Sequence, residues 1–524
     1  MRRFDSDPRL QILRSLTHYN SMSSSSSIVP AASFDHASKK AATPSYLIWV
    51  VCIFTCLNLA VFLLRAVSIL RFGSLFGTTG GECLMTYSIW KKMHGYPIYE
   101  SPLTKPFSLS LYNYLFYYVY AEVFRALGWW DAQILTFGRM LTALFAVIGA
   151  LAQWQLVRMK ISSRIHTYLC LGICLGLWLS TSVVRWWALT IRPDIPAVAL
   201  VTLALLCLGR VSGIKGAVLA ACFFYLAWSF KQSIALIAAA CIVYLLATRR
   251  RSGFILLAIF GGAIAITFLL GTEAYRYSVF NAPRVVPSFT VSYAWTSLKQ
   301  PLVTFSFFLV PLLLLLVRPW QRHFDFSDML RLAALLSFVG GCIAMGKAGA
   351  GDNYLFEMFI AGTTLLLLEL FRDPNRKLVL AFLLLACVQP AVQVVGNFFG
   401  RQTFGAVEIA NVQDFAHAQT IQQRVMQLPG PLLTTDEVLS LPWNSTHNLY
   451  PAYVFDLVFI EGAKGHLFAG GPIGMIERGE VPTLMLKTSD AELWRSAAGK
   501  YKKTGEETHQ HFHYDLFAIR ADAK

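Results

Sequence analysis

The chain has 524 residues, of which 56% are hydrophobic and only 14% are charged. Ordinary soluble domains are about 45–50% apolar and about 25% charged. A soluble fold of this size could not bury so much apolar surface, so the composition predicts an integral membrane protein. The 45 Lys and Arg residues outnumber the 29 Asp and Glu residues, but they lie in short clusters between apolar runs. That distribution argues against a nucleic-acid binder, which would gather basic residues on one face.

The first 44 residues are polar and contain the serine run 23–27. We expect residues 1–44 to form a disordered cytosolic tail. The apolar run that follows, at about 45–70, is too long for the core of a signal peptide, and no small-residue cleavage site follows it. It therefore predicts an uncleaved signal-anchor helix that leaves the N-terminus in the cytosol.

Further apolar runs predict membrane spans, each of which needs about 20 residues. With the signal anchor, the predicted spans are 45–70, 132–157, 165–184, 195–210, 216–230, 233–248, 253–270, 300–317, 329–346, 353–371 and 378–397. The stretch 108–127 is different because it is rich in Tyr and Phe and carries Glu122 and Arg125. These features suit an amphipathic helix on the membrane surface.

The basic clusters decide the topology. If 108–127 lies on the membrane surface, all the clusters fall on the side of the N-terminal tail, as the positive-inside rule requires. The clusters are Arg158, Lys160 and Arg164; Arg210 and Lys215; Arg249, Arg250 and Arg251; Arg318, Arg322 and Arg331; and Arg372, Arg376 and Lys377. We therefore predict about eleven spans. The segments then expected outside are the loop 71–131, the turn 185–194, the corner at Lys231, the loop 271–299, the stretch 346–353 and the C-terminal region.

The residues after about 397 have ordinary charge density and more Gly and Pro. Alternating patterns in PLLTTDE and HYDLFAI indicate strands, so we expect 398–524 to form a small extracytoplasmic domain of α/β or α+β type. The predicted fold is thus an all-α polytopic membrane protein, with a transmembrane domain at 45–397 followed by that C-terminal domain.

Acidic residues mark two of the external loops. Glu82 begins an amphipathic segment just after the first span, and it is either a general base at the membrane surface or a helix-capping carboxylate. Asp194 lies in RWWALTIRPDIP, at the predicted start of a helix after the rigid Arg192–Pro193 corner. It is either a helix cap paired with Arg192 or part of a surface for phosphate and sugar, since Arg binds phosphate and Trp stacks on pyranose faces.

Two other polar groups interrupt apolar sequence. Lys231 and Gln232 lie inside the apolar stretch 216–248, where a cation is a functional candidate by default; the alternative is a snorkelling loop lysine. The stretch GKAGAGDNYLFE, at 346–357, places Lys347 and Asp352 at the external start of a span. Helical spacing puts Asn353 and Glu357 on one helix face.

The order of these features resembles the GT-C fold membrane glycosyltransferases, the class of the oligosaccharyltransferases, protein O-mannosyltransferases and the aminoarabinose transferase. The stretches GECLMTYSIWKKMHGYPIYE, SLYNYLFYYVYAEVF, RPDIPAVAL, WSFKQSIAL and GAGDNYLFE carry this resemblance and are similar to those of bacterial members. It covers residues 45 to 400. In one respect the chain departs from the pattern: many members have Asp or an Asp–Glu pair where this chain has Glu82 preceded by two glycines.

The resemblance implies a sugar donor on a polyprenyl phosphate, with Glu82 as the catalytic acid/base and Asp194 as the acidic residue of the second loop. The acceptor is an unidentified glycan, lipid or protein. We predict that the enzyme works without a metal ion. The candidate residues for binding the donor phosphate and sugar are Arg192, Lys231, Gln232, Lys347, Asp352, Asn353, Tyr354, Glu357, His94 and Tyr99.

Two other classes of protein share these features. A transporter or flippase of lipid-linked or small-molecule substrates has many spans and intramembrane charges, and a non-catalytic assembly subunit uses the same carboxylates as helix caps. We expect the protein in a bacterial cytoplasmic membrane, as part of the cell-envelope machinery, with its active face toward the periplasm. Asn444, Ser445 and Thr446 form an N-glycosylation acceptor that would be modified in a eukaryotic lumen.

Overall fold

A computed structural model gives the fold of one compact unit, residues Thr43–Lys524. The residues that it describes are 45–78, 81–104, 108–181, 183–285, 325–346, 351–372, 382–388, 412–444, 448–451, 468–488, 499–509 and 512–521, with a few single positions between 291 and 316 and residue 391. The predicted tail at 1–44 lies outside the described residues.

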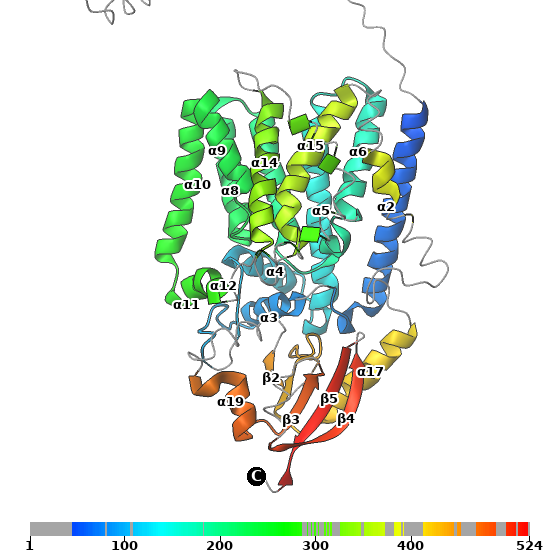
Figure 1. The fold of residues 1–524 in the computed structure, drawn as a ribbon, viewed down its shortest axis with the longest axis vertical. Helices are drawn as coiled ribbons and strands as arrows, with labels where there is room; N and C mark the ends of the chain where they lie inside the picture. Colours follow the sequence, from blue (N-terminus) through cyan, green and yellow to red (C-terminus); the bar gives the residue numbers. More distant parts are fainter. Residues whose placement is uncertain are drawn as a thin grey trace, which may run out of the picture. The chain divides into compact units, whose positions relative to one another are not determined.

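Long helices dominate the part of the chain up to residue 372 (Figure 1). The α-helices are α2 (Ser45–Phe72), α3 (Glu82–Met93), α4 (Tyr114–Ala126), α5 (Ile134–Arg158), α6 (Arg164–Leu179), α7 (Asp194–Arg210), α8 (Gly213–Phe230), α9 (Leu236–Thr248), α10 (Arg250–Leu270), α11 (Glu273–Arg276), α12 (Ala282–Val285), α14 (Phe326–Ala344) and α15 (Phe356–Arg372). Short 3-10 turns are η2 (Gly73–Leu75), η3 (Asp131–Gln133), η4 (Arg185–Leu189) and η6 (Asp352–Leu355), and η5 (Tyr277–Asn281) is a π-helical turn.

Six of the described helical segments are long and apolar enough to cross a membrane, so the chain is a multi-pass membrane protein. They are Ser45–Leu75, Asp131–Arg158, Gly213–Phe230, Arg250–Leu270, Phe326–Ala344 and Asp352–Arg372. Helices α6 and α9 are apolar but shorter. The predicted spans 300–317 and 378–397 fall largely outside the described residues.

The helices pack closely because small residues line their contacts. Helix α7 packs against α5 and α8, and α5 also packs against α6. At the last of these contacts the Trp178 ring covers Gly149, where a Cβ atom would come within 2.3 Å of the ring. Membrane helices associate through such close approaches, since lipid provides no hydrophobic force between them.

Helices α3 and α4 lie across one end of the long helices (Figure 1). Helix α4 has 13 residues, about 20 Å at the rise of an α-helix, which is too short for a hydrocarbon core of about 30 Å. One of its faces is buried, with Phe116, Tyr120 and Phe124 in the core. The short length and the single buried face of α4 agree with the surface helix predicted at 108–127. The side of the membrane on which it lies stays a prediction.

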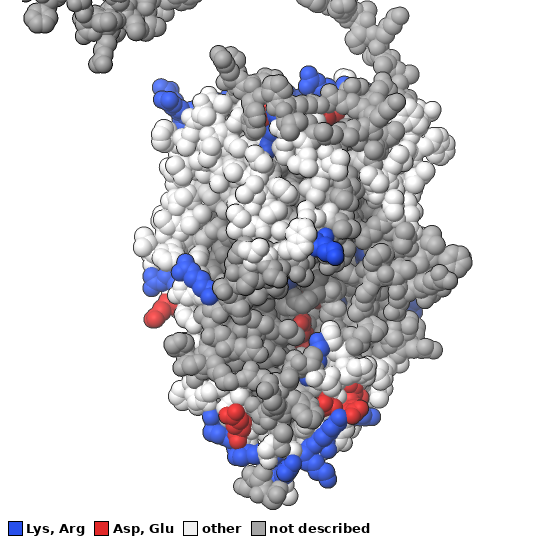
Figure 2. All heavy atoms as spheres, viewed as in Figure 1, with Lys and Arg blue, Asp and Glu red and all other residues white. Residues whose placement is uncertain are grey.

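The basic clusters gather at the opposite end of the helices. Arg158 ends α5, Arg210 ends α7 and Arg372 ends α15, whereas Asp194 begins α7 and is linked through Arg192 to Tyr112, just before α4. On the face in Figure 2, the described side chains over α8, α9, α10 and α14 are mostly uncharged between the two ends. This is the charge pattern of a protein whose middle lies in lipid.

The C-terminal region, which we define as the described residues from Val412 onwards, contains a mixed sheet. Its elements are α17 (Val412–Gln427), β1 (Leu432–Thr434), β2 (Asn448–Pro451), η7 (Phe468–Gly470), α19 (Gly471–Arg478), β3 (Thr483–Lys487), β4 (Tyr501–His509) and β5 (Phe512–Ile519). The strand order is β2-β1-β3-β5-β4; β1 pairs in parallel with β2 and β3, and the other pairs are antiparallel. The strands predicted in PLLTTDE and HYDLFAI are confirmed as β1 and β5.

A buried histidine joins the C-terminal region to the first helix. His509 is 2% exposed; its Nδ1 lies 2.6 Å from the Asp436 carboxylate, and its Nε2 lies 3.1 Å from the carbonyl oxygen of Leu75. Both partners are acceptors, so both ring nitrogens must donate, and only the imidazolium form does this. Burial would lower the pKa of His509, but Asp436 and the Leu75 carbonyl raise it above its ordinary value.

The N-glycosylation acceptor lies in the same region. Asn444 is buried: its Nδ2 donates to the Val438 carbonyl oxygen at 2.8 Å, and its Oδ1 accepts from Gln422 at 2.9 Å. Both ends of the amide are therefore used inside the fold. Ser445 and Thr446 lie outside the described residues.

The first prediction concerns this histidine. Because the pKa of His509 is raised in the fold, its contribution to stability is fully present below its unfolded value of about 6.5 and is lost as the pH rises through the folded value. We expect His509→Gln to lower the melting temperature of the detergent-solubilised protein more at pH 6 than at pH 9. The control is His513→Gln, which changes an exposed histidine of the same sheet. Equal losses at both pH values would contradict the imidazolium assignment.

The second prediction concerns topology. An impermeant maleimide applied to intact cells should label Lys502→Cys in β4, whereas Lys160→Cys, just after α5, should react only after permeabilisation. Both native lysines are exposed in the fold, so reactivity depends on the side of the membrane. Labelling of Lys160→Cys in intact cells would refute the proposed orientation.

Candidate functional site

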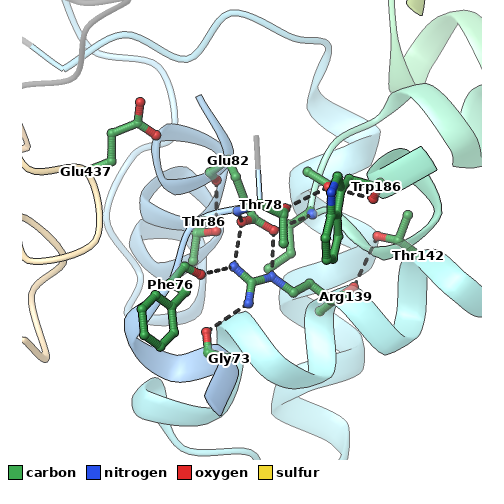
Figure 3. Close-up of polar contacts among 12 residues, drawn as sticks. Gly73, Phe76, Thr78, Glu82, Thr86, Arg139, Thr142, Trp186 and Glu437 are labelled. Carbon is green, nitrogen blue, oxygen red and sulfur yellow. Dashed lines mark hydrogen bonds and ion pairs between the residues drawn. The ribbon is translucent and has the colours of Figure 1, made fainter. Parts of the chain in front are cut away.

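The first loop is held by a buried ion pair, shown in Figure 3. Glu82 begins α3 and is 0% exposed. Its carboxylate accepts four hydrogen bonds: two from the Arg139 guanidinium at 2.9 and 2.6 Å, and one each from the Thr78 and Ile191 amides at 2.9 Å. These four donors use the principal acceptor positions of both oxygens.

Arg139 supplies the other half of this contact from the first turns of α5. It is 0% exposed and also donates to the carbonyl oxygens of Gly73 and Phe76, at the end of the first helix. One guanidinium thus links α5, the end of α2 and the start of α3. Because Arg presents its donors in a rigid planar fork, it fixes the relative positions of these segments.

The structure corrects the expected surroundings of Glu82. We expected a carboxylate at the interface between membrane and water, but this one is in the interior, because Arg139 compensates the charge there. Burial raises the pKa of Glu82, whereas Arg139 and the two amide donors lower it, and the balance lies below the ordinary value. Its role as acid/base stays a prediction, and its contacts favour a positioning role.

Asp194 forms the centre of a second buried cluster. It is 1% exposed, and its Oδ1 is paired with the Lys231 ammonium and accepts from Asn353 Nδ2 at 2.6 Å. Its Oδ2 accepts from Arg192 Nε at 3.3 Å. Asp194 thus begins α7 and pairs with Arg192, as the helix-cap alternative expected, but its carboxylate also contacts Lys231 and Asn353. Three segments far apart in the sequence meet at this one side chain.

Aromatic side chains surround Arg192. Its Nη2 donates to the Tyr112 hydroxyl at 2.7 Å, and its guanidinium lies 4.7 Å from the centre of the Trp187 ring. Trp187 in turn donates through Nε1 to Asp352 at 3.1 Å. Cation–π contact and the hydroxyl hold the guanidinium in one orientation while leaving it attached to Asp194.

Lys231 is buried beside this cluster. It is 2% exposed and lies 5.1 Å from the centre of the Tyr354 ring, so the snorkelling alternative is wrong. Its neighbour Gln232 donates to the carbonyl oxygens of Leu111 at 2.8 Å and Val279 at 3.3 Å. Gln232 therefore ties the corner after α8 to the first loop.

The cluster contains polar atoms that could form further hydrogen bonds. Among the described residues, Asn353 Oδ1 and Gln232 Oε1 accept no hydrogen bond. Lys231 carries three N–H donors, and in the described part of the chain Asp194 is the one side chain that accepts from them. Native proteins rarely leave buried polar atoms unsatisfied, so these atoms mark a place for a polar ligand.

The start of α15 differs from the expected geometry. We placed Asn353 and Glu357 on one helix face, but Asp352–Leu355 form a 3-10 turn and α15 begins at Phe356. The tighter turn sends Asn353 to Asp194, whereas Glu357 accepts from the Ile237 amide at 2.8 Å, near the start of α9. Glu357 thus satisfies a helix end inside the bundle.

The remaining predicted residues are scattered. His94 pairs with Asp131 at 2.9 Å on the exposed edge of α3 and contacts no member of the Asp194 cluster in the described structure. Tyr99 donates to the Tyr112 carbonyl oxygen at 2.7 Å and lines a cavity of about 620 Å³ between α4, α8 and α10. Lys347 lies outside the described residues.

Sequence reasoning missed three residues of the site. Arg139 was signalled by its position, because a lone arginine inside an apolar span is a functional candidate. Tyr112 had no signal in a stretch crowded with tyrosines. Glu437 comes from the C-terminal region, where it accepts from the Gly81 amide at 3.3 Å, and no local pattern predicts so distant a contact.

Within the described ranges, no three His, Cys, Asp or Glu side chains are grouped so that they could hold a metal ion. The expectation of a metal-independent enzyme stays a prediction.

Comparison with solved structures identifies the fold. The chain is similar to ArnT from Cupriavidus metallidurans in the apo state, with a TM-score of 0.54 and 13% identity over 91% of this chain and 99% of that one. The structure of the same protein bound to undecaprenyl phosphate gives a TM-score of 0.51 and 13% identity, over 90% and 98% of the chains.

An oligosaccharyltransferase of Archaeoglobus fulgidus gives a TM-score of 0.47 and 12% identity, over 87% of this chain and 74% of that one. No protein-family model and no curated protein sequence matches the chain. The likeness to ArnT confirms the resemblance to the GT-C fold glycosyltransferases, and at 13% identity it concerns the fold alone.

The third prediction tests the ion pair of the first loop. Removing one partner of a buried ion pair costs about 3–5 kcal/mol, whereas an exposed pair contributes about 0–1 kcal/mol. We expect Glu82→Gln to destabilise the protein strongly in thermal unfolding, because it leaves Arg139 buried without a countercharge. The control is Glu122→Gln, which removes an exposed partner of Arg125. A Glu82→Gln variant as stable as the control would restore Glu82 as the first candidate for the base.

Proposed function

We propose that this protein is a membrane glycosyltransferase that transfers a sugar from a polyprenyl-phosphate donor to an acceptor at the extracytoplasmic face of the membrane. The observation that carries the proposal is the buried cluster of Asp194, Arg192, Lys231 and Asn353, with its unsatisfied polar atoms. Fold likeness to ArnT, which has been solved with undecaprenyl phosphate bound, supports the class of donor.

The two cations suit the departing phosphate. As the bond between the sugar and the phosphate breaks, negative charge grows on the phosphate oxygens, and donors already in place stabilise it without reorganisation. Lys231 offers a compact charge and Arg192 a planar pair of donors. Asp194 contacts both and keeps them oriented, so we assign it a positioning role in this mechanism.

The sugar and the lipid need different surroundings. Asn353 Oδ1, which is buried and unsatisfied, suits a sugar hydroxyl as hydrogen-bond donor. The cavity beside Tyr99, lined also by Tyr114, Tyr225 and Ile266, offers aromatic and apolar surface near the membrane boundary for the first isoprene units. Tyr99 connects this cavity to the cluster through the Tyr112 backbone.

The fourth prediction tests donor use. In nanodiscs supplied with a set of polyprenyl-phosphate sugars, the wild type should transfer sugar from at least one of them. Lys231→Met should lower the rate by about 10²–10³-fold, the usual cost of removing a stabilising donor for developing charge. Lys160→Met changes an exposed lysine at the opposite end and should keep the wild-type rate.

A liposome experiment separates the enzyme from a transporter. Liposomes with donor in one leaflet would reveal intact lipid-linked sugar moving to the other leaflet. Movement of the intact donor without release of polyprenyl phosphate would contradict the proposed transfer reaction and support the flippase alternative.

A further inference from the structure

A glycine, Gly81, lies where the first loop meets the C-terminal region. Gly81 precedes α3 in a left-handed conformation, with φ of +79°, and a Cβ there would lie 3.7 Å from Arg192 Nη1 with no closer neighbour. The Glu437 carboxylate lies beside this glycine and accepts from the Gly81 amide at 3.3 Å. In Figure 3, Glu437 stands beside the first turn of α3, on a different segment from Glu82.

We propose that Glu437 is the general base that takes the proton from the acceptor hydroxyl, so that the C-terminal region supplies the catalytic carboxylate. This inference rests on the proposed function. It assigns a catalytic residue outside the transmembrane helices, about 350 positions from the loop that it serves.

The other carboxylates near this point are already engaged. Glu82 accepts four hydrogen bonds within the fold, and Asp194 is shared among Lys231, Arg192 and Asn353. A base needs a free lone pair aimed at the proton that it removes. Among the described residues, the Gly81 amide is the one group that donates to Glu437, and it binds Oε2. The other oxygen, Oε1, is therefore available to the hydroxyl group of the sugar acceptor.

The turn that carries Glu437 is rigid. It follows β1, and Asp436 Oδ1 accepts from the amides of Val438 at 3.0 Å and Leu439 at 2.8 Å, which encloses Glu437 between two fixed neighbours. Asp436 Oδ2 accepts from His509 Nδ1, and His509 Nε2 donates to the carbonyl oxygen of Leu75. The half-buried Glu437 side chain therefore has a fixed place beside the first loop.

The position suits attack on a sugar whose phosphate lies at the cations. Arg192 contacts Asp194 through Nε and faces Gly81 with Nη1, so it lies between the proposed phosphate site and Glu437. The acceptor O–H proton passes to Glu437, the acceptor oxygen forms a bond to the anomeric carbon, and the bond from that carbon to the phosphate oxygen breaks. The electron pair leaves with the polyprenyl phosphate.

The surroundings of Glu437 favour this role. Burial raises its pKa, the Gly81 amide lowers it, Asp436 and Glu82 raise it, and Arg192 lowers it, with a balance of about 7. The buried Cys83 thiol also lies within electrostatic reach: burial raises its pKa, and the Glu437 charge raises it further. A base with a pKa near the working pH combines a useful deprotonated fraction with good proton affinity. The transfer rate should rise with pH through about 7.

The fifth prediction uses the donor that the wild type accepts. Glu437→Gln keeps an oxygen for the Gly81 amide but cannot take a proton, so kcat should fall by about 10²–10⁴-fold with donor KM changed by less than about threefold. The remaining activity should lose the rise with pH through about 7. The control is Glu477→Gln, an exposed carboxylate on α19 of the same region, which should keep wild-type kcat.

A rescue experiment tests the position itself. Asp is tolerated in the left-handed conformation better than most residues, and the space at Gly81 is open except for Arg192 at ordinary contact distance. In the Glu437→Gln background, Gly81→Asp should restore kcat at least about tenfold, whereas the uncharged Gly81→Asn should not. Recovery with Asp alone would show that a carboxylate is needed at this point.

The outcomes separate the two proposals. A Glu437→Gln variant with kcat within about threefold of the wild type overturns the inference, as does one that loses donor binding together with turnover. Equal effects of Gly81→Asp and Gly81→Asn also count against it. A wild type that uses no polyprenyl-phosphate donor overturns the proposed function and this inference with it.

Discussion

The ion pair between Glu82 and Arg139 is the contact on which the external end of this protein depends. A guanidinium inside a span would be costly in lipid, and a carboxylate with no water around it would be equally costly. Together they satisfy each other, and the carboxylate also binds the Ile191 amide of the second loop. Both loops are thereby fixed to the same helix, and Asp194 follows Ile191 by three residues at the start of α7.

The C-terminal region adds a second set of fixed contacts at the same end. His509 bridges Asp436 and the carbonyl oxygen of Leu75, the last residue of η2, and Phe76 stacks on its ring at 6.1 Å. Phe72 and Phe415 pack beside them. Since an imidazolium with two acceptors has one geometry, the sheet cannot slide relative to α3 without losing both bonds.

Hydrophobic pattern and charge were sufficient to predict the six described helices that could cross a membrane and two of the strands, because these features are local in the sequence. The count of about eleven spans and the surface position of α4 stay predictions. Pattern and charge also located Asp194, Arg192, Lys231 and Asn353, since polar residues inside apolar runs are conspicuous. They could not pair Glu82 with Arg139, or place Glu437 beside Gly81, because such contacts depend on tertiary packing. The spacing of Asn353 and Glu357 misled for a physical reason: a 3-10 turn separates them.

The neighbouring carboxylates Asp436 and Glu437 show how one turn separates two tasks. Asp436 is buried, which raises its pKa, but His509 and backbone amides lower it, and the balance is below the ordinary value. Glu437, one residue later, accepts from the Gly81 amide and makes no hydrogen bond to His509 in the described structure. Its pKa is raised to about 7. Environments that push two adjacent pKa values apart assign different roles to like groups. Asp436 is suited to stay charged and hold the region in place, whereas Glu437 is suited to exchange a proton. Docking of the C-terminal region and placement of the proposed base therefore depend on the same five residues, 435–439.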